Sequence, residues 1–249
     1  MIMSNYDNFA CVYDVLMRDA DYEGRTEYLF KLFKKYGAVP TLLLDVACGT
    51  GGFSNLFALK GVEVIGVDMS EEMLMAAREN SAELGTDVLF LCQKAEELDL
   101  YGTVDGAICC LDSINHITDK KELQRSFDKI SLFLEPQKLF IFDVNTEYKH
   151  EKILGNNTFV MDEDDVYCIW QNSYNEKKKI TDITLDFFVK DGEIYERSGE
   201  EFSERAYDFG QLTEMLENAG FTVEEIFDDM TENPICDTTE RAIFVCRKK

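Results

Sequence analysis

The sequence predicts an α/β fold of the doubly wound type, a mostly parallel sheet with helices on both faces. Short apolar runs of strand length alternate with segments of helical periodicity over residues 1–146, and the pattern resumes over 207–249. The first apolar run, residues 41–47, ends directly in a glycine turn, as is typical of a strand buried on both faces. With 45% hydrophobic and 12% aromatic residues among 249, the chain can bury the core that such a fold needs.

The elements follow in order along the chain. Residues 22–36 carry apolar side chains at helical spacing and stop at Gly37, so a helix precedes the first strand. Ser70, followed by two glutamates, is the expected N-cap of the helix after the second strand. Further helices are expected over 53–59, near 119–133 and over 207–220, and strands over 41–47, 62–68, 87–92, 105–111, 138–144, near 222–227 and over 241–247.

Residues 147–206 have a different pattern. Ile183, Leu185, Phe187 and Val189 alternate with polar residues, and Asp191-Gly192 is a hairpin signal. We expect a two- or three-stranded antiparallel β insertion after the fifth strand, either a lid over the site or a homodimer interface, since such a ribbon must bury one face. The main domain then comprises 1–146 and 207–249.

Composition excludes several classes of protein. The formal charge of −24 repels nucleic acid and anionic membranes, and no run approaches the length of a membrane span. The N-terminal segment lacks the features of a signal peptide, so we expect a soluble cytoplasmic protein. The eight cysteines contain no C-x-x-C and are expected to be reduced thiols, and two histidines alone argue against a metal site.

A nucleoside-containing ligand is the strongest functional prediction. Asp45 and the glycines Gly49 and Gly51 follow the first strand, and Asp68 ends the second. In an open α/β sheet ligands bind at the carboxyl ends of the strands, where glycines admit close backbone contact and an acid can accept ribose hydroxyls. Ser54 stands where a dinucleotide-binding loop needs its third glycine, which weakens the alternative of a nicotinamide-dependent oxidoreductase.

The motifs LLLDVACGTG (42–51) and VIGVDMSEEML (64–74) resemble those of class I S-adenosylmethionine-dependent methyltransferases of the small-molecule type. The resemblance extends through FLCQKAEELDL (90–100), VDGAICCLDSINHI (104–117), LEPQKLFIFDVNT (134–146) and LTEMLENAGFTVEEIF (212–227). It implies a Rossmann-like, seven-stranded sheet, S-adenosylmethionine as cofactor and a small-molecule methyl acceptor. A non-catalytic nucleoside-binding protein with the same fold stays open as an alternative.

Carried over position by position, the resemblance implies that the turn from Ala47 to Gly51 lines the methionine moiety and that Asp45 receives its ammonium group. Asp45 could equally cap the turn. Asp68 would bind the ribose and Met69 pack on adenine, with Lys94 and Ala95 reading adenine through their backbone, because a lysine cannot accept the hydrogen bond that an acid accepts there in many relatives. Leu111 and Tyr13 complete the predicted cofactor site, and Tyr6, Phe9 and Tyr22 form an aromatic cluster with Tyr13.

Residues 111–116 leave the fourth strand, at whose end the donated methyl group should lie. Their polar side chains are candidate substrate contacts. The alternative is a capped start of a helix, in which Asp112 or Ser113 bonds backbone N–H groups and His116 is a polar loop residue. No catalytic residue is predicted, because methyl transfer from a sulfonium requires alignment and the exclusion of water rather than a nucleophilic side chain. The identity of the acceptor is likewise left open.

Overall fold

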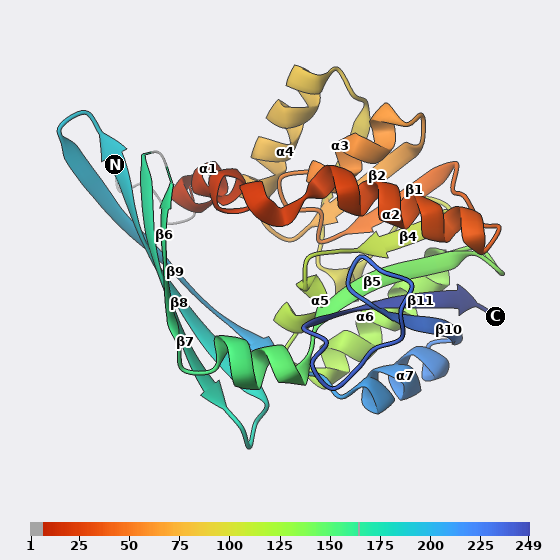
Figure 1. Cartoon of the computed structure of the whole chain (residues 1–249). Helices are drawn as coiled ribbons and strands as arrows, with labels where there is room; N and C mark the ends of the chain where they lie inside the picture. Colours follow the sequence, from red (N-terminus) through yellow and green to blue (C-terminus); the bar gives the residue numbers. More distant parts are fainter. Residues whose placement is uncertain (1–6, 164) are drawn as a thin grey trace.

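A twisted sheet runs through the centre of the main domain (Figure 1). The computed structural model describes residues 7–163 and 165–249, and side chains from residue 12 onward. Within these residues the strand order is β10-β11-β5-β4-β1-β2-β3. The strand bounds are β1 (Leu42–Val46), β2 (Glu63–Asp68), β3 (Val88–Cys92), β4 (Gly106–Cys109), β5 (Leu139–Asn145), β10 (Phe221–Asp228) and β11 (Arg241–Lys248). Strands β1 to β5 are parallel, and β11 is antiparallel to both its neighbours, which confirms the predicted fold class.

Helices cover both faces of this sheet, because its strands are apolar on both sides. In β5, Leu139 and Ile141 pack into the layer under α2 and α3, while Phe140 and Phe142 pack under α6 and α7. The helices are α1 (Asp7–Leu16), α2 (Tyr22–Lys35), α3 (Gly52–Leu59), α4 (Glu71–Leu84), α5 (Ser113–His116), α6 (Lys120–Phe133) and α7 (Phe209–Asn218), with the short 3₁₀ turns η1 (Arg18–Ala20) and η2 (Ala95–Glu97). The Ser70 hydroxyl accepts the Met73 N–H at 3.2 Å, which confirms the predicted N-cap of α4.

The insertion begins with a π-helical turn, η3 (Lys149–Leu154), and continues as a separate antiparallel sheet (Figure 1). Its described strands are β6 (Thr158–Glu163), β7 (Val166–Asn175), β8 (Ile180–Asp191) and β9 (Ile194–Arg205), in that spatial order. The expectation of two or three strands was therefore wrong: four strands pair, because the edge segment Thr158–Glu163, which has no clear alternation of apolar and polar residues, also pairs with β7. The hairpin at Gly192 connects β8 and β9 as predicted.

One face of the insertion is buried within the chain itself. Ile183, Leu185 and Phe187 are at most 6% exposed and pack with Val12 of α1. Helix α1 was not predicted, although Val12, Tyr13 and Leu16 recur at helical spacing. Among the described helices, none combines the length and the apolarity that crossing a bilayer requires.

Candidate functional site

The glycine turn after β1 is built from residues in the left-handed region of backbone conformation. Ala47, Gly49 and Gly51 have φ angles of 56°, 54° and 80°. A Cβ atom added at Gly49 would meet nothing within 4 Å, whereas one at Gly51 would lie 3.1 Å from the Phe90 ring. Gly51 therefore serves packing, and Gly49 leaves open space in which a ligand can approach the backbone.

Ser54 occupies the position at which a dinucleotide-binding loop has its third glycine, and the bond made by its hydroxyl explains why a serine stands there. It donates a 2.6 Å hydrogen bond to Oδ2 of Asp45, whose side chain is almost completely buried. Burial raises the pKa of Asp45 to about 7, and repulsion from Asp68 adds to the effect. Within the described residues Ser54 is the hydrogen-bond partner of Asp45, whose carboxylate retains capacity for a cationic or donor group of a ligand.

Asp68, at the end of β2, fastens the glycine turn to the second strand. Its Oδ2 accepts the Gly49 N–H and its Oδ1 the Ser70 N–H, both at 2.9 Å. Burial raises the pKa of Asp68, although these backbone donors oppose the shift. Each oxygen keeps a further lone pair, as a ribose diol requires. The neighbouring Met69 is 68% exposed, which leaves its face free for a planar ring.

A pocket gathers half of the predicted cofactor residues. Tyr13, Asp45, Ala47, Gly49 and Leu111 all line it. Its other lining residues are Tyr22, Cys48, Phe53, Cys110 and Ser113. Burial raises the pKa of Tyr13 and, to about 12, that of Tyr22, so both phenols are neutral.

The remaining predicted residues lie beside this pocket or outside the described part of the chain. In the sheet register Cys92 stands opposite Asp68, so Lys94 and Ala95 follow β3 next to the Asp68–Met69 segment. Their role in adenine recognition stays a prediction. Tyr6 lies outside the described residues, and so does the side chain of Phe9.

The loop from β4 to α5 is held by a clamp that sequence reasoning missed. Leu111 and Asp112 both have positive φ angles, 54° and 53°. The Asp143 carboxylate accepts their two backbone N–H groups at 2.7 Å each, and Arg241 bonds both Asp143 and Asp112. A single acid inside the apolar run of β5 was the signal that could have pointed to Asp143.

This clamp gives Asp112 a different role from the capping one considered above. Its side chain makes no cap hydrogen bond to α5, so that alternative was wrong for Asp112, and Ser113 bonds the Cys110 carbonyl instead. Burial is the largest single effect on Asp112 and opposes its ionisation, but Arg241, His116 and Lys149 together outweigh it and lower the pKa to about 2. Asp112 is therefore a carboxylate at neutral pH.

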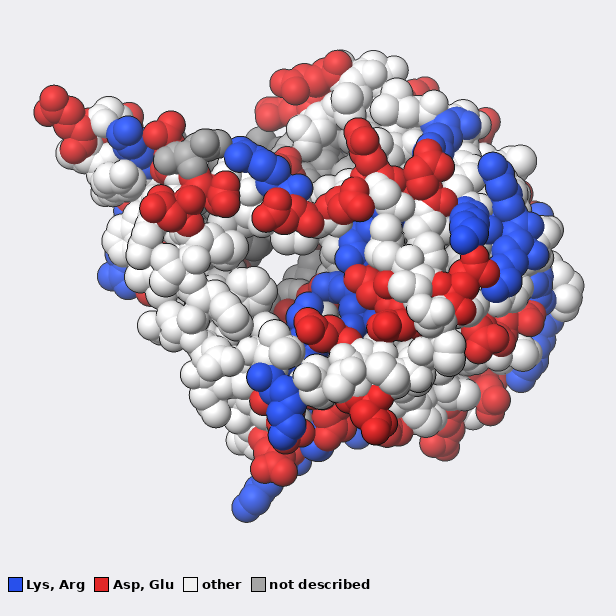
Figure 2. All heavy atoms as spheres, viewed as in Figure 1, with Lys and Arg blue, Asp and Glu red and all other residues white. Residues whose placement is uncertain are grey.

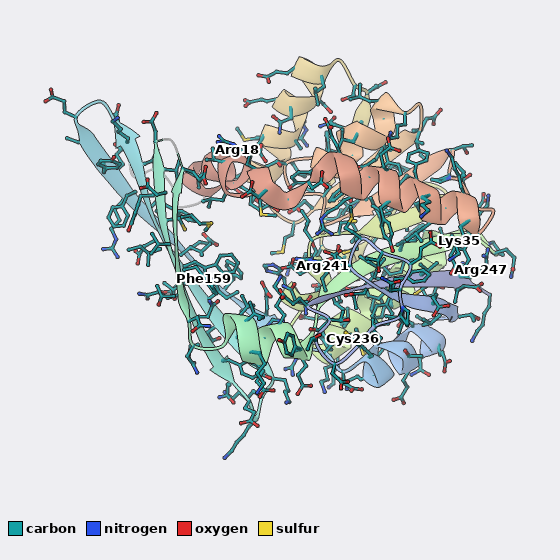
Figure 3. All side chains as sticks on the ribbon, in the orientation of Figure 1. Arg18, Lys35, Phe159, Cys236, Arg241 and Arg247 are labelled. Carbon is teal, nitrogen blue, oxygen red and sulfur yellow. The ribbon has the colours of Figure 1, made fainter. Side chains whose placement is uncertain are left out.

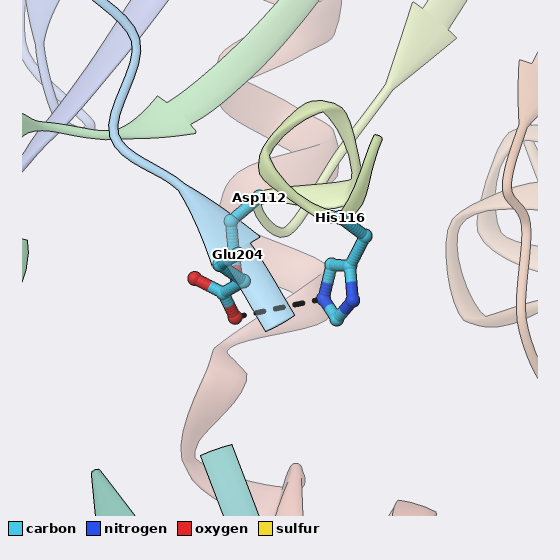
Figure 4. A group of neighbouring side chains, drawn as sticks. All are labelled: Asp112, His116 and Glu204. Atoms are coloured by element: carbon cyan, nitrogen blue, oxygen red, sulfur yellow. Dashed lines mark ion pairs between the residues drawn. The ribbon is translucent and has the colours of Figure 1, made fainter. Parts of the chain in front are cut away.

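His116 and Asp112 face a glutamate from the insertion, Glu204 of β9 (Figure 4). Nε2 of His116 lies 3.6 Å from Glu204 Oε1, and Nε2 of His150, in η3, lies 3.7 Å from Oε2. Burial, followed by repulsion from Asp112, raises the pKa of Glu204 to about 8. Burial also lowers the pKa values of both histidines, that of His150 to about 4.

An opening separates the insertion from the main domain (Figure 2). Figure 3 places Phe159 of β6 and Arg241 on opposite sides of it. The pocket at the glycine turn shares one loop with the group of Asp112, His116 and Glu204, called the Glu204 cluster below. Leu111 and Ser113 of this loop line the pocket, while Asp112 and His116 face the insertion. The arrangement can hold a nucleoside-linked cation on the glycine turn and a second molecule beside it.

Comparison with known proteins agrees with this geometry. Residues 43–137 match a family model described as a methyltransferase domain. The chain is 32% identical to the putative methyltransferase YqeM of Bacillus subtilis over 98% of this chain and 97% of the relative. It is 33% identical to a putative methyltransferase of Geobacillus, over 98% and 99%.

A solved S-adenosylmethionine-dependent methyltransferase from Clostridium acetobutylicum is 32% identical, with a TM-score of 0.89 and 98% of both chains covered. Matches of this length include the insertion as well as the sheet domain. The chain therefore belongs to the family of S-adenosylmethionine-dependent methyltransferases.

Proposed function

We propose that this methyltransferase binds its cofactor on the β1 glycine turn and methylates a small molecule held in the opening under the insertion. The observation that carries the proposal is the position of the β4–α5 loop, which contributes to both the cofactor pocket and the Glu204 cluster. In-line transfer requires the donor and the acceptor to meet at one place, and this loop is where the two sites adjoin.

The residues of the pocket fit S-adenosylmethionine better than a dinucleotide. Asp45 is an acid, and none of the described residues that line the pocket is basic. Such a pocket attracts an ammonium and a sulfonium and repels a pyrophosphate. We therefore assign the methionine moiety to Asp45, Ala47 and Gly49, the ribose to Asp68 and the adenine to Met69 with the backbone of Lys94 and Ala95. Tyr13 and Leu111 would enclose the reacting end.

When bound, the cofactor supplies an electrophilic methyl group. The chain's own residues then position and enclose the reactants: Asp45 orients the ammonium of the donor, Gly49 admits it to the backbone, and the rigid Leu111–Asp112 loop fixes the wall between the two sites. We assign to the insertion the exclusion of water from the two reactants.

We infer that the insertion is a lid rather than a subunit interface. Its apolar face is occupied by Val12 and its neighbours in α1, so it needs no second subunit for burial. We also place the enzyme in the cytoplasm, since Cys109, Cys110, Cys168 and Cys246 are buried free thiols, which suit a reducing compartment.

The test is calorimetry followed by turnover. S-adenosylhomocysteine should bind the purified protein and NADH should not. Radiolabelled methyl transfer from S-adenosylmethionine to a panel of small molecules should then give a labelled product of low molecular weight. Label found only in added protein or nucleic acid would overturn the small-molecule assignment, and binding of NADH alone would overturn the cofactor assignment.

A further inference from the structure

Glu204 is a buried carboxyl group between the two histidines of the sequence. Its residue is 3% exposed, although it lies on β9 at the edge of the insertion sheet. His116 and His150 each direct Nε2 toward one of its oxygens. Burying a carboxyl group is costly, and only Asn145, at 3.3 Å, is recorded as donating a hydrogen bond to it within the described residues. Packing alone does not explain such a residue.

Asn145 provides an independent indication of a ligand. It is 4% exposed, and its Nδ2 donates to Glu204 Oε2, but its Oδ1 has no hydrogen-bond partner among the described residues. A buried amide oxygen without a donor is uncommon and costs free energy. The Glu204 carboxyl group and this unpartnered amide oxygen belong to side chains that are bonded to each other, so a donor is missing next to Glu204.

The cluster is open to a molecule from one side. His116 keeps 44% of its side-chain surface exposed while its ring stacks on Phe202 at 4.9 Å. It is also near enough to Asp68, the predicted ribose ligand, for each to alter the pKa of the other. His116 therefore lies between the cofactor side and Glu204, with a face left uncovered.

A divalent cation is the competing occupant. One ligand atom from each of Asp112, His116 and Glu204 lies within 4.8 Å of the others. However, Arg241 already bonds Asp112 Oδ1 at 2.6 Å. The positive charge of its guanidinium group repels a divalent cation more strongly than it repels a singly charged one.

We propose that Glu204 and His116 bind the methyl acceptor and that the acceptor presents a primary or secondary amine, with His116 accepting the proton that the amine must lose. The inference rests on the proposed function and names the substrate class of that site. An alkylammonium offers several N–H donors, which suits the acceptors on Glu204 and Asn145.

The protons balance as follows. The acceptor enters as an ammonium ion, and the Glu204 carboxyl group releases its proton to solvent as the opposite charge arrives. A ring nitrogen of neutral His116 takes one proton from the ammonium, which restores the nitrogen lone pair. That lone pair forms the new N–C bond as the C–S bond breaks and its electrons remain on sulfur. The products are a methylated ammonium ion and S-adenosylhomocysteine, and His116 returns its proton to solvent.

The charged groups around this pair set its pH dependence. They are Asp112 from the β4–α5 loop, Asp68 from β2, Lys149 and His150 from η3, and Arg241 from β11. Burial holds the pKa of His116 below 6.5 despite the two aspartates. Transfer should therefore decrease on the acidic side of the pH profile, where His116 becomes protonated and can no longer accept a proton.

The experiment compares amines with matched alcohols as methyl acceptors. Cyclohexylamine, phenethylamine and glucosamine are each assayed beside the alcohol of the same skeleton, with wild type, Glu204→Gln, His116→Gln and the control Glu201→Gln. Glu201 lies on the same strand but is exposed. Amines alone should be methylated, kcat should fall by about 10²-fold or more in both site variants, and His116→Gln should lose the acidic limb of its pH profile. Glu201→Gln should match wild type.

Binding measurements separate this inference from the proposed function. Affinity for S-adenosylhomocysteine should be unchanged in all variants, and an amine binding to the loaded wild type at pH 7 should release a proton that Glu204→Gln does not release. Methylation of alcohols but not amines, no amine product from a protein that binds S-adenosylhomocysteine, or activity abolished by EDTA and restored by Mg²⁺ would overturn the amine assignment. Failure to bind S-adenosylhomocysteine would instead refute the cofactor site.

Discussion

Asp68 joins the glycine turn to β2 and is the residue on which nucleoside binding should depend most. Asp68→Ala removes the acceptor of the Gly49 N–H as well as the proposed ribose contact. Hydrogen bonds to a charged acceptor contribute about 1.5–3 kcal/mol each, so affinity for S-adenosylhomocysteine should fall by about 10²-fold or more in calorimetry. Glu71→Gln, a similar loss of charge at an exposed position on α4, should bind normally. Normal binding by a folded Asp68→Ala variant would refute the assignment.

Glu204 should make the stability of the protein depend on pH. Its pKa is raised in the folded state, so its protonated form stabilises the fold below the unfolded pKa, near 4.3, and this contribution is lost as the pH rises through about 8. Glu204→Gln keeps the neutral form at every pH. Its melting temperature relative to wild type should therefore increase between pH 5 and pH 9, and a constant difference across that range would contradict the assigned ionisation.

Residues of the site differ in how far sequence could reveal them. Asp45, Gly49 and Asp68 stand in local motifs next to strand ends, where spacing along the chain fixes spacing in the fold. The Asp112–Arg241 pair joins residues 129 positions apart, and Glu204 reaches the site from the insertion. Partners of this kind depend on strand order and register, which no local pattern encodes.

At the scale of the element, substitutions of glycine in the β1 turn should distinguish the loss of ligand access from the effect of backbone strain. Gly49→Val places a branched side chain in a left-handed position that is otherwise empty. Gly85→Val is the matched control, since Gly85 has a φ of 67°, meets nothing within 4 Å and ends α4 away from the pocket. Both variants should lose similar stability in thermal melts, and only Gly49→Val should lose cofactor binding. Equal binding by the two variants would show that the open space at Gly49 is not used.

The clamp on the β4–α5 loop should be a large stabilising element. Arg241→Gln leaves Asp112 and Asp143 buried without their counter-charge, an effect that typically costs about 3–5 kcal/mol. Arg197→Gln, which removes an exposed arginine that pairs with Asp186 on the insertion, should cost at most about 1 kcal/mol. Denaturant unfolding measures both. A comparable small loss in the two variants would mean that the loop holds its conformation without the clamp.

Strands and helices with a regular pattern were predicted well, and irregular ones were not. Most strands of the main sheet are apolar runs, and β1, β4 and β5 are buried along almost their whole length, so their positions followed from the sequence. Helix α1 and strand β6, which were not predicted, owe their structure to contacts with the rest of the molecule. Tertiary packing decides such segments, and propensity alone does not.

For the whole molecule, the position of the insertion predicts a monomer with a lid. Phe159→Ala, at the side of the opening, should raise KM for the acceptor without changing affinity for S-adenosylhomocysteine. Tyr195→Ala, an exposed aromatic at the β8–β9 hairpin, is the control and should change neither. Sedimentation should give one subunit for all three proteins. A wild-type dimer that Tyr195→Ala dissociates would make the insertion an interface.

The last strand to leave the ribosome among those described occupies an interior position. Strand β11 pairs with β5 on one side and β10 on the other, and it carries Arg241. During synthesis, β1 to β5 and the whole insertion emerge while the place of β11 is still unfilled and the β5 edge is unpaired. The β4–α5 loop, which lies between the two proposed ligand sites, therefore receives its Arg241 contacts last. A nascent or truncated chain that lacks β11 should not be able to consume the cofactor.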